Sequence, residues 1–467
     1  MSAPERHRWW ALLPLTLAVL TLGFDITILN VALPTIAADL GAGTAELQWM
    51  VNAYVLVFAG LMLPCGALGD RYGHRRSMLA GLALFAAGSL VAAAAHTAGP
   101  VIAARAVMGL GAAVLTPIAL ATLPVLFPDA RERAKALSVV IAAMGAGIPL
   151  GPLIGGWLLD HYWWGSIFLI NVPVAAAALV ATALLIPEFR DPDPRPVDVL
   201  GAVLATTGLV AAVYGVIEAP TRGWTDPVTV VALAGGAALV AVFVWWQRRT
   251  RHPIIDLPLF GEPLFVWGSV AAALASFALL GLLFVVPQYL HLVGGYDAFG
   301  TGLRLLPVIG GIVVGAPLGE RLAGLCGVRV PVAGGLLLAT AGLTLGATTD
   351  AATGYALTAT WLAATGAGVG AALAPAVDAV LGVLPPERSG SGIAITMTFR
   401  YVGGAVGVAV LGSLLAGHHA ATPVAAFMDG MTTVLLVSAA VTATGAALTA
   451  AALPRRGAPT AIGPART

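Results

Sequence analysis

A single carboxylate lies in the middle of an otherwise apolar run near the start of the chain. Asp25 stands in the stretch LGFDITILNVALP, which covers residues 22–34. A second charge, Arg105, lies in the segment ARAVMGLG within another apolar run. Ionisable side chains in hydrocarbon are costly, and in membrane proteins they mark ion paths, proton relays or ligand contacts. These two residues are therefore the first candidates for a site that binds and releases a proton.

The positions of the two residues predict that they lie at the same depth. Asp25 is about 20 Å along a helix that begins near Leu12, which places it in the outer half of a bilayer core of roughly 30 Å. Arg105 is about five residues inside a helix that enters from the outer side, so the two side chains could pair. Burial disfavours a charged carboxyl and a nearby arginine favours it. An acid with alternating access to the two sides could therefore bind and release a proton.

Each residue also has a purely structural interpretation. Asp25 could stay ionised and only hold helices together, and Arg105 could extend its side chain to the outer headgroups. Position alone favours the headgroup interpretation for Arg105. We favour the coupling role for Asp25, because most other acids fall in loops or at helix ends.

The helix around Asp25 carries small and polar residues on two opposite sides. A lipid-facing helix would not do so, which predicts a buried helix with one stripe on its neighbours and the other on a cavity. At 100° per residue, one stripe comprises Pro14, Ala18, Thr21, Asp25 and Ala32, and the other comprises Thr16, Gly23, Thr27, Asn30 and Pro34.

The composition of the chain indicates an all-α polytopic membrane protein. The 467 residues are 59% hydrophobic and only 10% charged, whereas a soluble domain carries about 25% charged residues. The basic start is followed by an apolar run of about 20 residues without a small-residue cleavage site. This run is therefore predicted to be a retained first span rather than a signal peptide.

Apolar stretches long enough to cross a bilayer predict fourteen transmembrane helices. They are expected near residues 9–30, 46–68, 77–97, 101–123, 134–158, 166–187, 197–218, 228–247, 264–290, 302–320, 329–348, 352–380, 391–415 and 429–453. Of the 23 Lys and Arg residues, this topology leaves only Arg222 in an outer loop, with Arg105, Arg304 and Arg400 within or at the ends of spans. Because cytoplasmic loops carry the excess of positive charge, both termini are expected in the cytoplasm. We expect a plasma membrane location, and the preference for Arg over Lys hints at a bacterial source.

Short segments of the first half recur in order in the second half. GLGAAVLTP (109–117) resembles GVGAALAP (368–375), and LGDR (68–71) resembles LGER (318–321). These matches indicate two pseudo-repeated six-helix bundles, and their offset leaves room for two inserted central helices. The predicted division is an N-terminal bundle at 1–187, the inserted pair at 188–250, a C-terminal bundle at 251–454 and a cytoplasmic tail at 455–467.

Two glycine-rich motifs could control the movement of helices. In GALGDRYGHRR (66–76) the glycines permit close helix approach and a tight turn, and Asp70 could pair with an arginine or cap the next helix. In GAGIPLGPLIGG (145–156) Gly147, Gly151 and Gly155 repeat on one face, where a neighbouring helix can approach closely. Without a specific role, the first motif would be a positive-inside anchor and the second a packing face. The predicted functional residues are Gly66, Gly69, Asp70, Arg71, Gly73, Arg75 and Arg76 in the loop, and Gly147, Gly151, Pro152, Gly155 and Gly156 in the helix.

Taken together, these motifs resemble those of the major facilitator superfamily, and in particular its fourteen-helix drug:proton antiporter family. The loop resembles the G-x-L-x-D-R-x-G-x-R-R signature, and the helix resembles the antiporter motif taken to separate exporters from importers. The R-x-x-x-G-x-G setting of Arg105 resembles a helix-4 motif implicated in proton coupling. With this resemblance, a coupling role for Arg105 is at least as well supported as the headgroup interpretation. FDITILNVALP resembles the family's first helix, and in YWWGSIFLINVP (162–173) Trp164, Phe168, Asn171 and Pro173 match its entry to helix 6. The resemblance implies exchange of external protons for cytoplasmic hydrophobic compounds by alternating access.

The motifs are weaker in the second half of the chain. GERLAGLCGVR keeps only part of the loop pattern, with Glu320 where the first half has Asp70. Glu218 and Asp378 are acids near span ends, where interfacial anchoring is the better interpretation. Asn30, Glu218, Glu320 and Asp378 are thus second-tier candidates. With one clear mid-span acid, neutral or singly charged lipophilic substrates are favoured over dications.

Other classes of membrane protein fit the sequence less well. The only lysine, Lys135, lies in no phosphate-binding loop, which argues against a nucleotide-driven pump. The histidines mostly fall in loops without a catalytic constellation, so no enzyme, metal or cofactor is expected. Cys65 and Cys326 are predicted to be free and structural. The expected partners are a small hydrophobic substrate, protons and the lipid bilayer, with no nucleic acid or nucleotide. The main alternative is a facilitator or proton symporter that imports a small metabolite, and a non-transporting receptor is also open.

Overall fold

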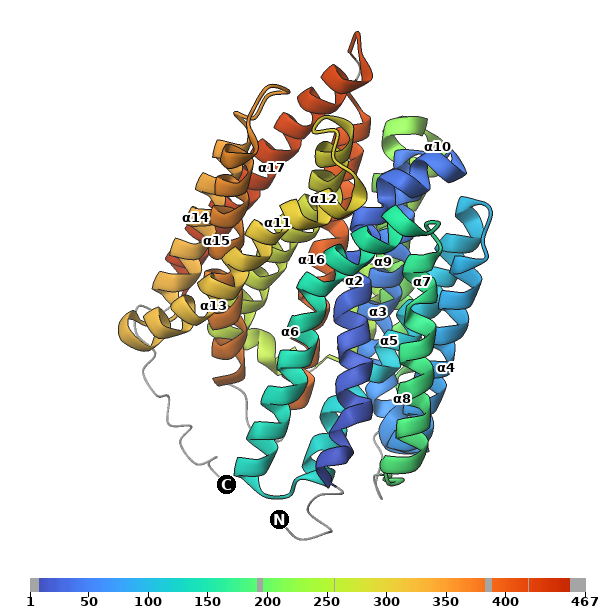
Figure 1. The fold of residues 1–467 in the computed structure, drawn as a ribbon. Coiled ribbons are helices and arrows are strands. Elements are labelled where there is room, and N and C mark those ends of the chain that lie inside the picture. The colour runs from blue at the N-terminus through green and yellow to red at the C-terminus, as the bar shows by residue number, and fades with distance from the viewer. Residues whose placement is uncertain (1–7, 191–195, 256, 383–388, 419, 454–467) are drawn as a thin grey trace.

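The computed structural model describes residues 8–190, 196–255, 257–382, 389–418 and 420–453. These described residues contain 14 helices that are long and apolar enough to cross a membrane, which confirms the predicted number. The α7–α8 pair and the α12–α13 pair each form one of these spans. The helices (Figure 1) are α2 (Leu12–Leu40), α3 (Thr44–Tyr72), α4 (His74–Ala93), α5 (Ala98–Leu126), α6 (Ala130–His161), α7 (Ser166–Leu169), α8 (Asn171–Leu185), α9 (Val199–Arg222), α10 (Pro227–Gln247), η1 (Leu257–Gly261), α11 (Pro263–Leu292), α12 (Ala298–Arg304), α13 (Leu306–Cys326), α14 (Arg329–Gly346), α15 (Tyr355–Gly382), α16 (Ser389–Ala416) and α17 (Pro423–Ala452).

The first helix is longer than the sequence predicts. The expected span ends near residue 30, whereas α2 continues through Pro34 to Leu40. It stops at Gly41, whose φ of 64° is the left-handed conformation that commonly ends a helix at glycine. Pro34 does not break the helix, since a neighbouring helix can compensate for a missing backbone bond inside a membrane bundle. The helix therefore extends beyond the apolar run that identifies it.

Two groups of helices lie side by side and meet along a seam. α2 to α8 contact one another, and so do α11 to α17, as Figure 1 shows. The helices α9 and α10 pack on each other, and α9 also contacts α3 from the first group and α16 from the second. The seam itself is formed by contacts of α3 with α16, α2 with α11, and α6 with α12. We call the end where α2 begins and α17 ends the base of the bundle.

The two groups are joined at the end opposite the base. Gly156 of α6 lies against the backbone of α12, where an added Cβ would meet the Ala298 carbonyl oxygen at 2.6 Å. The Asp160 carboxylate accepts hydrogen bonds from the backbone N–H groups of Ala298 and Phe299, each at 3.2 Å. Gln48 of α3 donates across the seam to two carbonyl oxygens of α16. This end of the seam is therefore closed by backbone approach and by hydrogen bonds.

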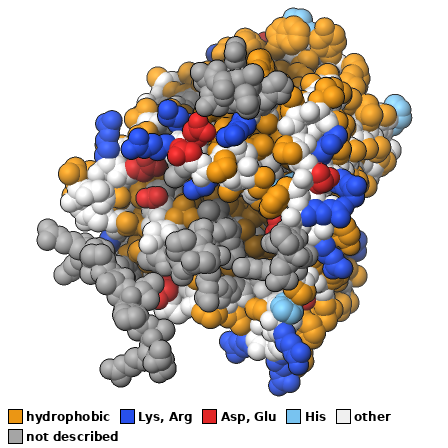
Figure 2. Space-filling view, turned by 90° about the horizontal axis from the view of Figure 1, so that it is seen from below, with side chains coloured by type: hydrophobic (Ala, Val, Ile, Leu, Met, Phe, Trp, Pro, Cys, Tyr) orange, Lys and Arg blue, Asp and Glu red, His pale blue; other side chains and the backbone are white. Residues whose placement is uncertain are grey.

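At the base, part of α6 is exposed within the described part of the chain. Val139 and Ile141 are exposed, and so are Leu137, Ser138 and Ala142. At 100° per residue these positions cover about 200° of the helix circumference, and the buried Ala136 and Val140 lie on the remaining side. Figure 2 looks onto the base and shows Lys and Arg side chains around a central hollow. Among the described residues, the arrangement is open toward the base and closed at the other end.

Asp160 is expected to stabilise this closed end. Asp160→Ala removes the acceptor that caps the N-terminus of α12 from the opposite group, which typically costs about 1 kcal/mol. The population should therefore shift about fivefold toward conformations in which α6 and α12 separate. Spin labels at the exposed positions Tyr162 and Leu303, in a variant without native cysteines, would report this separation as a longer distance.

A matched control comes from the inserted pair. Asp226 caps α10 in the same way, by accepting from the N–H groups of Val228 and Thr229, but this cap does not bridge the two groups. Asp226→Ala should leave the distance distribution between the labels unchanged. Equal shifts in both variants would contradict a specific role for Asp160 in closing the seam.

The two cysteines differ in their surroundings. Both are free, as expected. Cys65 is buried in α3 and contributes to the core, whereas Cys326 is exposed at the last residue of α13. The prediction of a structural role is therefore wrong for Cys326, because an exposed side chain at a helix end packs against little.

Candidate functional site

The two predicted charges form a buried ion pair. Arg105 Nη1 lies 2.5 Å from Asp25 Oδ2, and the side chains are 2% and 0% exposed respectively. Asp25 lies near the middle of α2, and Arg105 lies in the second turn of α5. The prediction that the two side chains pair is confirmed, and the headgroup interpretation of Arg105 is wrong. Its guanidinium points inward because a carboxylate and a carbonyl oxygen accept its hydrogen bonds there.

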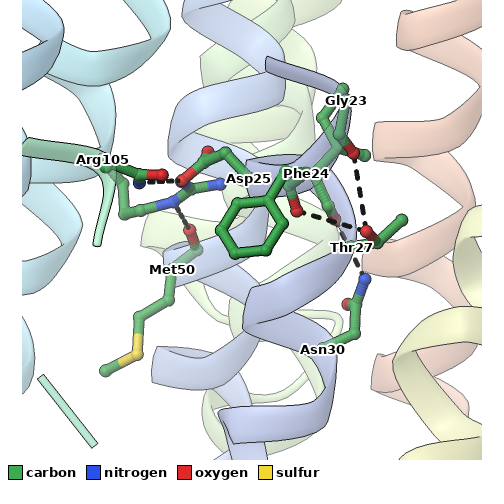
Figure 3. Close-up of polar contacts among 9 residues, drawn as sticks. Gly23, Phe24, Asp25, Thr27, Asn30, Met50 and Arg105 are labelled. Atoms are coloured by element: carbon green, nitrogen blue, oxygen red, sulfur yellow. Dashed lines mark hydrogen bonds and ion pairs between the residues drawn. The ribbon is translucent and has the colours of Figure 1, made fainter. Parts of the chain in front are cut away.

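Arg105 is held by three groups at once. Its Nε donates to the Met50 carbonyl oxygen at 3.0 Å, and its guanidinium lies 4.3 Å from the centre of the Tyr54 ring. Figure 3 shows the Arg105 side chain between Asp25 and Met50. Gly109, one turn along α5, allows this approach, since a Cβ there would meet the Tyr54 carbonyl oxygen at 2.5 Å. The R-x-x-x-G spacing thus lets α3 come close enough to bind the arginine.

A second donor reaches the other oxygen of the Asp25 carboxylate. Asn171 Nδ2 lies 3.1 Å from Asp25 Oδ1, and the asparagine is 1% exposed. Asn171 is the first residue of α8. The carboxylate therefore receives one charged and one neutral donor, from two helices that are distant in sequence. The sequence matched Asn171 to a motif but gave no sign that it contacts Asp25.

A small cavity lies beside the ion pair. Side chains of α2, α3, α5 and α11 line it, including Asn30, Tyr54 and Arg105. It has room for little more than a water molecule. The Tyr54 hydroxyl and the Asn30 Oδ1 are buried without a hydrogen-bond partner among the described residues. Buried polar atoms of this kind are usually satisfied by water, so the cavity suits a bound water next to Arg105.

The predicted division of α2 into a packed stripe and a cavity stripe is wrong in part. The stripe with Asp25 is buried as expected, but Gly23 and Thr27 on the other side pack on α6. Thr27 Oγ1 donates to the Ile148 carbonyl oxygen at 3.0 Å (its contacts within α2 are shown in Figure 3). Only Asn30 from that stripe reaches the cavity. Small residues on a helix face can equally serve close packing, which periodicity alone does not distinguish from a cavity.

The repeated glycines of α6 form the surface on which α2 packs. A Cβ on Gly147 would meet the Leu20 carbonyl oxygen at 2.6 Å, and one on Gly151 would lie 2.9 Å from the Ile28 nitrogen. Gly155 faces the Ile28 side chain. Gly156 is directed instead at α12, and the Pro152 carbonyl oxygen lies against Gly302 of α12. The predicted close approach is confirmed, and α6 in addition contacts the second group of helices.

The glycines of the loop motif also lie at close contacts. Gly66 and Gly69 face Pro117 and Ile118 of α5, and Gly73 connects α3 to α4 with a φ of 105°. A left-handed backbone of this kind favours glycine. The motif glycines thus fix the angle between α3, α4 and α5 at the base.

Asp70 does not pair with an arginine. Its carboxylate lies 3.1 Å from His74 Nε2, and the other ring nitrogen of His74 lies 3.2 Å from Thr122 Oγ1. His74 is the buried first residue of α4 rather than a loop residue. The prediction of an arginine partner is wrong because α3 ends before Gly73 and α4 begins after it, and the change of direction at Gly73 brings the buried His74 side chain against Asp70.

The arginines of the motif bind other segments. Arg75 donates to the Ala183 carbonyl oxygen at the end of α8. Arg76 lies 3.5 Å from Glu188, and the exposed Arg71 lies beside the Tyr72 ring. The contacts of Arg75 and Arg76 attach the start of α4 to the end of α8 and to the segment that follows it.

The remaining acids do not join the ion pair. Glu218 pairs with Arg222 one turn along α9, at 3.1 Å. Glu320 on α13 and Asp378 on α15 are exposed. Among the described residues, no group of three or more His, Cys, Asp or Glu side chains could hold a metal ion.

The described residues form two groups of membrane-spanning helices, and the buried charge pair lies within the first group. Comparison with known proteins gives the family: the Major Facilitator Superfamily profile matches residues 15–408, so the chain belongs to this superfamily. The chain is 35% identical over 418 residues to the multidrug resistance protein Stp of Mycobacterium tuberculosis, covering 90% of this chain and 78% of Stp. It is 34% identical to the tetracenomycin C resistance and export protein of Streptomyces glaucescens, covering 88% and 76% of the two chains.

Further comparisons agree with this assignment. The methyl viologen resistance protein SmvA of Salmonella typhimurium is 33% identical, with coverage of 89% of this chain and 84% of SmvA. Among solved structures, a bacterial homologue of the human lysosomal transporter Spinster, in an inward-facing and unoccupied conformation, matches with a TM-score of 0.68 at 17% identity. That match covers 98% of this chain and 100% of the other. The chain thus has the superfamily fold, and its relatives are drug-resistance and drug-export proteins.

Proposed function

We propose that this protein exports hydrophobic drugs or antibiotics across the plasma membrane in exchange for protons, by alternating access. The observation that carries the proposal is the Asp25–Arg105 pair, which is fully buried beside the seam between the two groups of helices. A buried carboxylate is retained in a membrane protein at a considerable cost in free energy, which a role in binding protons would explain. The names of the relatives support the substrate class.

The proposed orientation places the base in the cytoplasm. Lys and Arg residues concentrate in the loops on that side, as the positive-inside rule requires. The opening toward the base then gives cytoplasmic substrate access to the seam, and the joined ends of α6 and α12 close the outer side. The N-terminal bundle 1–187, the C-terminal bundle 251–454 and the inserted pair 188–250 are our proposed moving units.

The ion pair fits a particular step of the exchange. In the proposed scheme, the ion pair with Arg105 is the state in which Asp25 is a carboxylate, the form expected after a proton has been released to the cytoplasm. When the bundle opens outward, water from the outer side can bring a proton to Asp25 and weaken its attraction to Arg105. Protonation would then bias the bundle toward the next step. In this scheme, the α3–α4 loop and the glycine face of α6 are the elements that move, or against which neighbouring helices move.

The substrate class follows from the charge at the seam. Arg105 and Asn171 occupy both oxygens of the Asp25 carboxylate in this conformation. No further acid of the described membrane-spanning residues lies in this contact, so little negative charge is left for a substrate. This favours neutral or singly charged lipophilic compounds. One relative is named for resistance to methyl viologen, which is a dication, so a dication should also be tested as a substrate.

The main alternative is import of a small metabolite by a facilitator or a proton symporter. A D-xylose–proton symporter shares the fold, with a TM-score of 0.67 at 14% identity, and the fold alone does not decide direction. Export is favoured because the chain is much more similar in sequence to export and resistance proteins.

The direction of transport can be tested in bacteria that lack their own efflux pumps. Cells that express the protein should accumulate less Hoechst 33342 or tetracenomycin C than cells with an empty vector, and a protonophore should abolish the difference. Higher accumulation in the expressing cells would favour the import alternative. An Asp39→Asn variant, altered at an exposed acid of the same helix, should behave as the wild type.

A further inference from the structure

Asn171 has the chemistry to support both protonation states of Asp25. We propose that it is a positioning residue with two roles: its amide N–H donates to the Asp25 carboxylate, and its amide oxygen accepts from the Asp25 carboxylic acid after a proton binds. The inference rests on the proposed antiport function, because it concerns how the proton-binding group is kept satisfied in the membrane. It assigns a role to a residue outside the ion pair.

The geometry supports the first of these roles. Asn171 Nδ2 lies 3.1 Å from Asp25 Oδ1, and both side chains are at most 1% exposed. The turn before Asn171 is anchored by Ile167 and Phe168, both 0% exposed. Pro173 occupies the first turn of α8, where backbone donors lack helical partners in any case. The backbone of Asn171 is therefore held close to the carboxylate.

The second role follows from an atom that lacks a partner. Asn171 Oδ1 is buried and has no hydrogen-bond partner among the described residues. A buried carbonyl oxygen without a partner is unfavourable. An amide carries two donors on nitrogen and an acceptor oxygen, whereas a carboxylate only accepts. Rotation of the amide about its Cβ–Cγ bond exchanges the donor for the acceptor without moving the backbone.

The proton step can be written with all charges in place. A proton from the outer water binds Asp25 Oδ1 and makes a neutral carboxylic acid, while Arg105 keeps its charge and its bond to the Met50 carbonyl. The new O–H of Asp25 then donates to Asn171 Oδ1, which replaces the earlier N–H···O bond. On the cytoplasmic side the proton leaves and the amide rotates back. Neither state leaves the Asp25 oxygen facing Asn171 without a partner.

The direction of the expected pH effect follows from hydrogen-bond strengths. The titratable or charged side chains that the structure places at Asp25 are Arg105 from α5 and Tyr54 from α3, and Asn171 is the neutral donor from α8. Hydrogen bonds to a charged acceptor are roughly twice as strong as neutral ones. Removing the amide should therefore destabilise the carboxylate more than the acid.

Infrared difference spectroscopy of the purified protein in lipid can test this without a substrate. The carboxylic acid C=O band that titrates in the wild type and is absent in Asp25→Asn is assigned to Asp25. In Asn171→Leu, which replaces the amide with an apolar group of similar size, we expect this band at higher wavenumber. Asn171→Ala, which removes the amide without added bulk, should give the same change and serves if the leucine variant does not fold.

Asn52 offers a matched control. It is a 0% exposed asparagine on α3, and neither its side-chain nitrogen nor its oxygen has a partner among the described residues. Asn52→Leu should leave the Asp25 band unchanged. An unchanged band in the Asn171 variants, or an equal shift in the Asn52 variant, would overturn the role of Asn171 alone. If no band differs between wild type and Asp25→Asn at any pH, the proposed proton site itself fails.

Discussion

Asp25→Asn is expected to abolish uphill export driven by a pH gradient. Asparagine keeps the size of the side chain but cannot take up a proton, so the exchange loses its driving ion. In proteoliposomes with an imposed pH gradient, accumulation of Hoechst 33342 should fall to the level of liposomes without protein. Exchange of dye for dye at equal pH needs no net proton movement and should persist. Loss of both activities would point to a structural role for the carboxylate.

The substitution also changes stability, and this effect has to be separated from coupling. Breaking a buried ion pair by removing one partner costs about 3–5 kcal/mol, because the other charge stays buried. Asp25→Asn should therefore lower the melting temperature through Arg105. The double variant Asp25→Asn with Arg105→Gln removes both charges, and it should recover much of the stability without recovering proton-driven transport. Asp39→Asn on the same helix should change neither quantity.

Gly147→Val is expected to prevent α2 from packing on α6. The added Cβ would meet the Leu20 carbonyl oxygen at 2.6 Å and the Phe24 nitrogen at 2.7 Å. These are backbone atoms, which cannot rotate away as a side chain can, so the helices must separate. Overpacking typically costs about 1–3 kcal/mol, and here it also displaces the helix that carries Asp25. We expect a lower melting temperature and a loss of most transport activity.

Gly145 on the same helix provides the control for this substitution. Nothing lies within 4 Å of a Cβ added there, and valine differs from glycine in helix propensity in the same way at both positions. Gly145→Val should therefore keep both stability and transport. If the two variants behave alike, the close approach of α2 and α6 is not what the glycines provide.

The sequence predicted the fold because membrane physics leaves few choices. Apolar runs of sufficient length have to form helices, and the positive charges fix the topology. The predicted end of α2 is wrong, because the helix continues through Pro34 to Leu40. A proline does not have to end a helix inside a membrane bundle. The sequence also predicted that Asp25 and Arg105 meet, because two charges at one depth have few other partners in hydrocarbon.

Contacts that depend on the third dimension were not predictable. Asn171 and Tyr54 reach the charge pair only because α8 and α3 pack beside α2 and α5, which no local pattern specifies. In the sequence, Asp160 is an ordinary acid at the end of a predicted helix. Its role in joining α6 to α12 depends on where the second group of helices lies. His74 took the place expected for an arginine because α4 begins at His74, three residues before the predicted start near residue 77. In each case spacing gave the face of the helix, and packing determined the partner.

The most direct test of the proposed mechanism is proton movement coupled to substrate in inverted membrane vesicles. A pH-sensitive dye would report the proton gradient, and Hoechst 33342 would be added to vesicles that contain wild-type protein or Asp25→Asn. We expect the dye substrate to dissipate part of the gradient in wild-type vesicles and to leave it unchanged in the variant. Equal dissipation in both would contradict Asp25 as the proton-binding group.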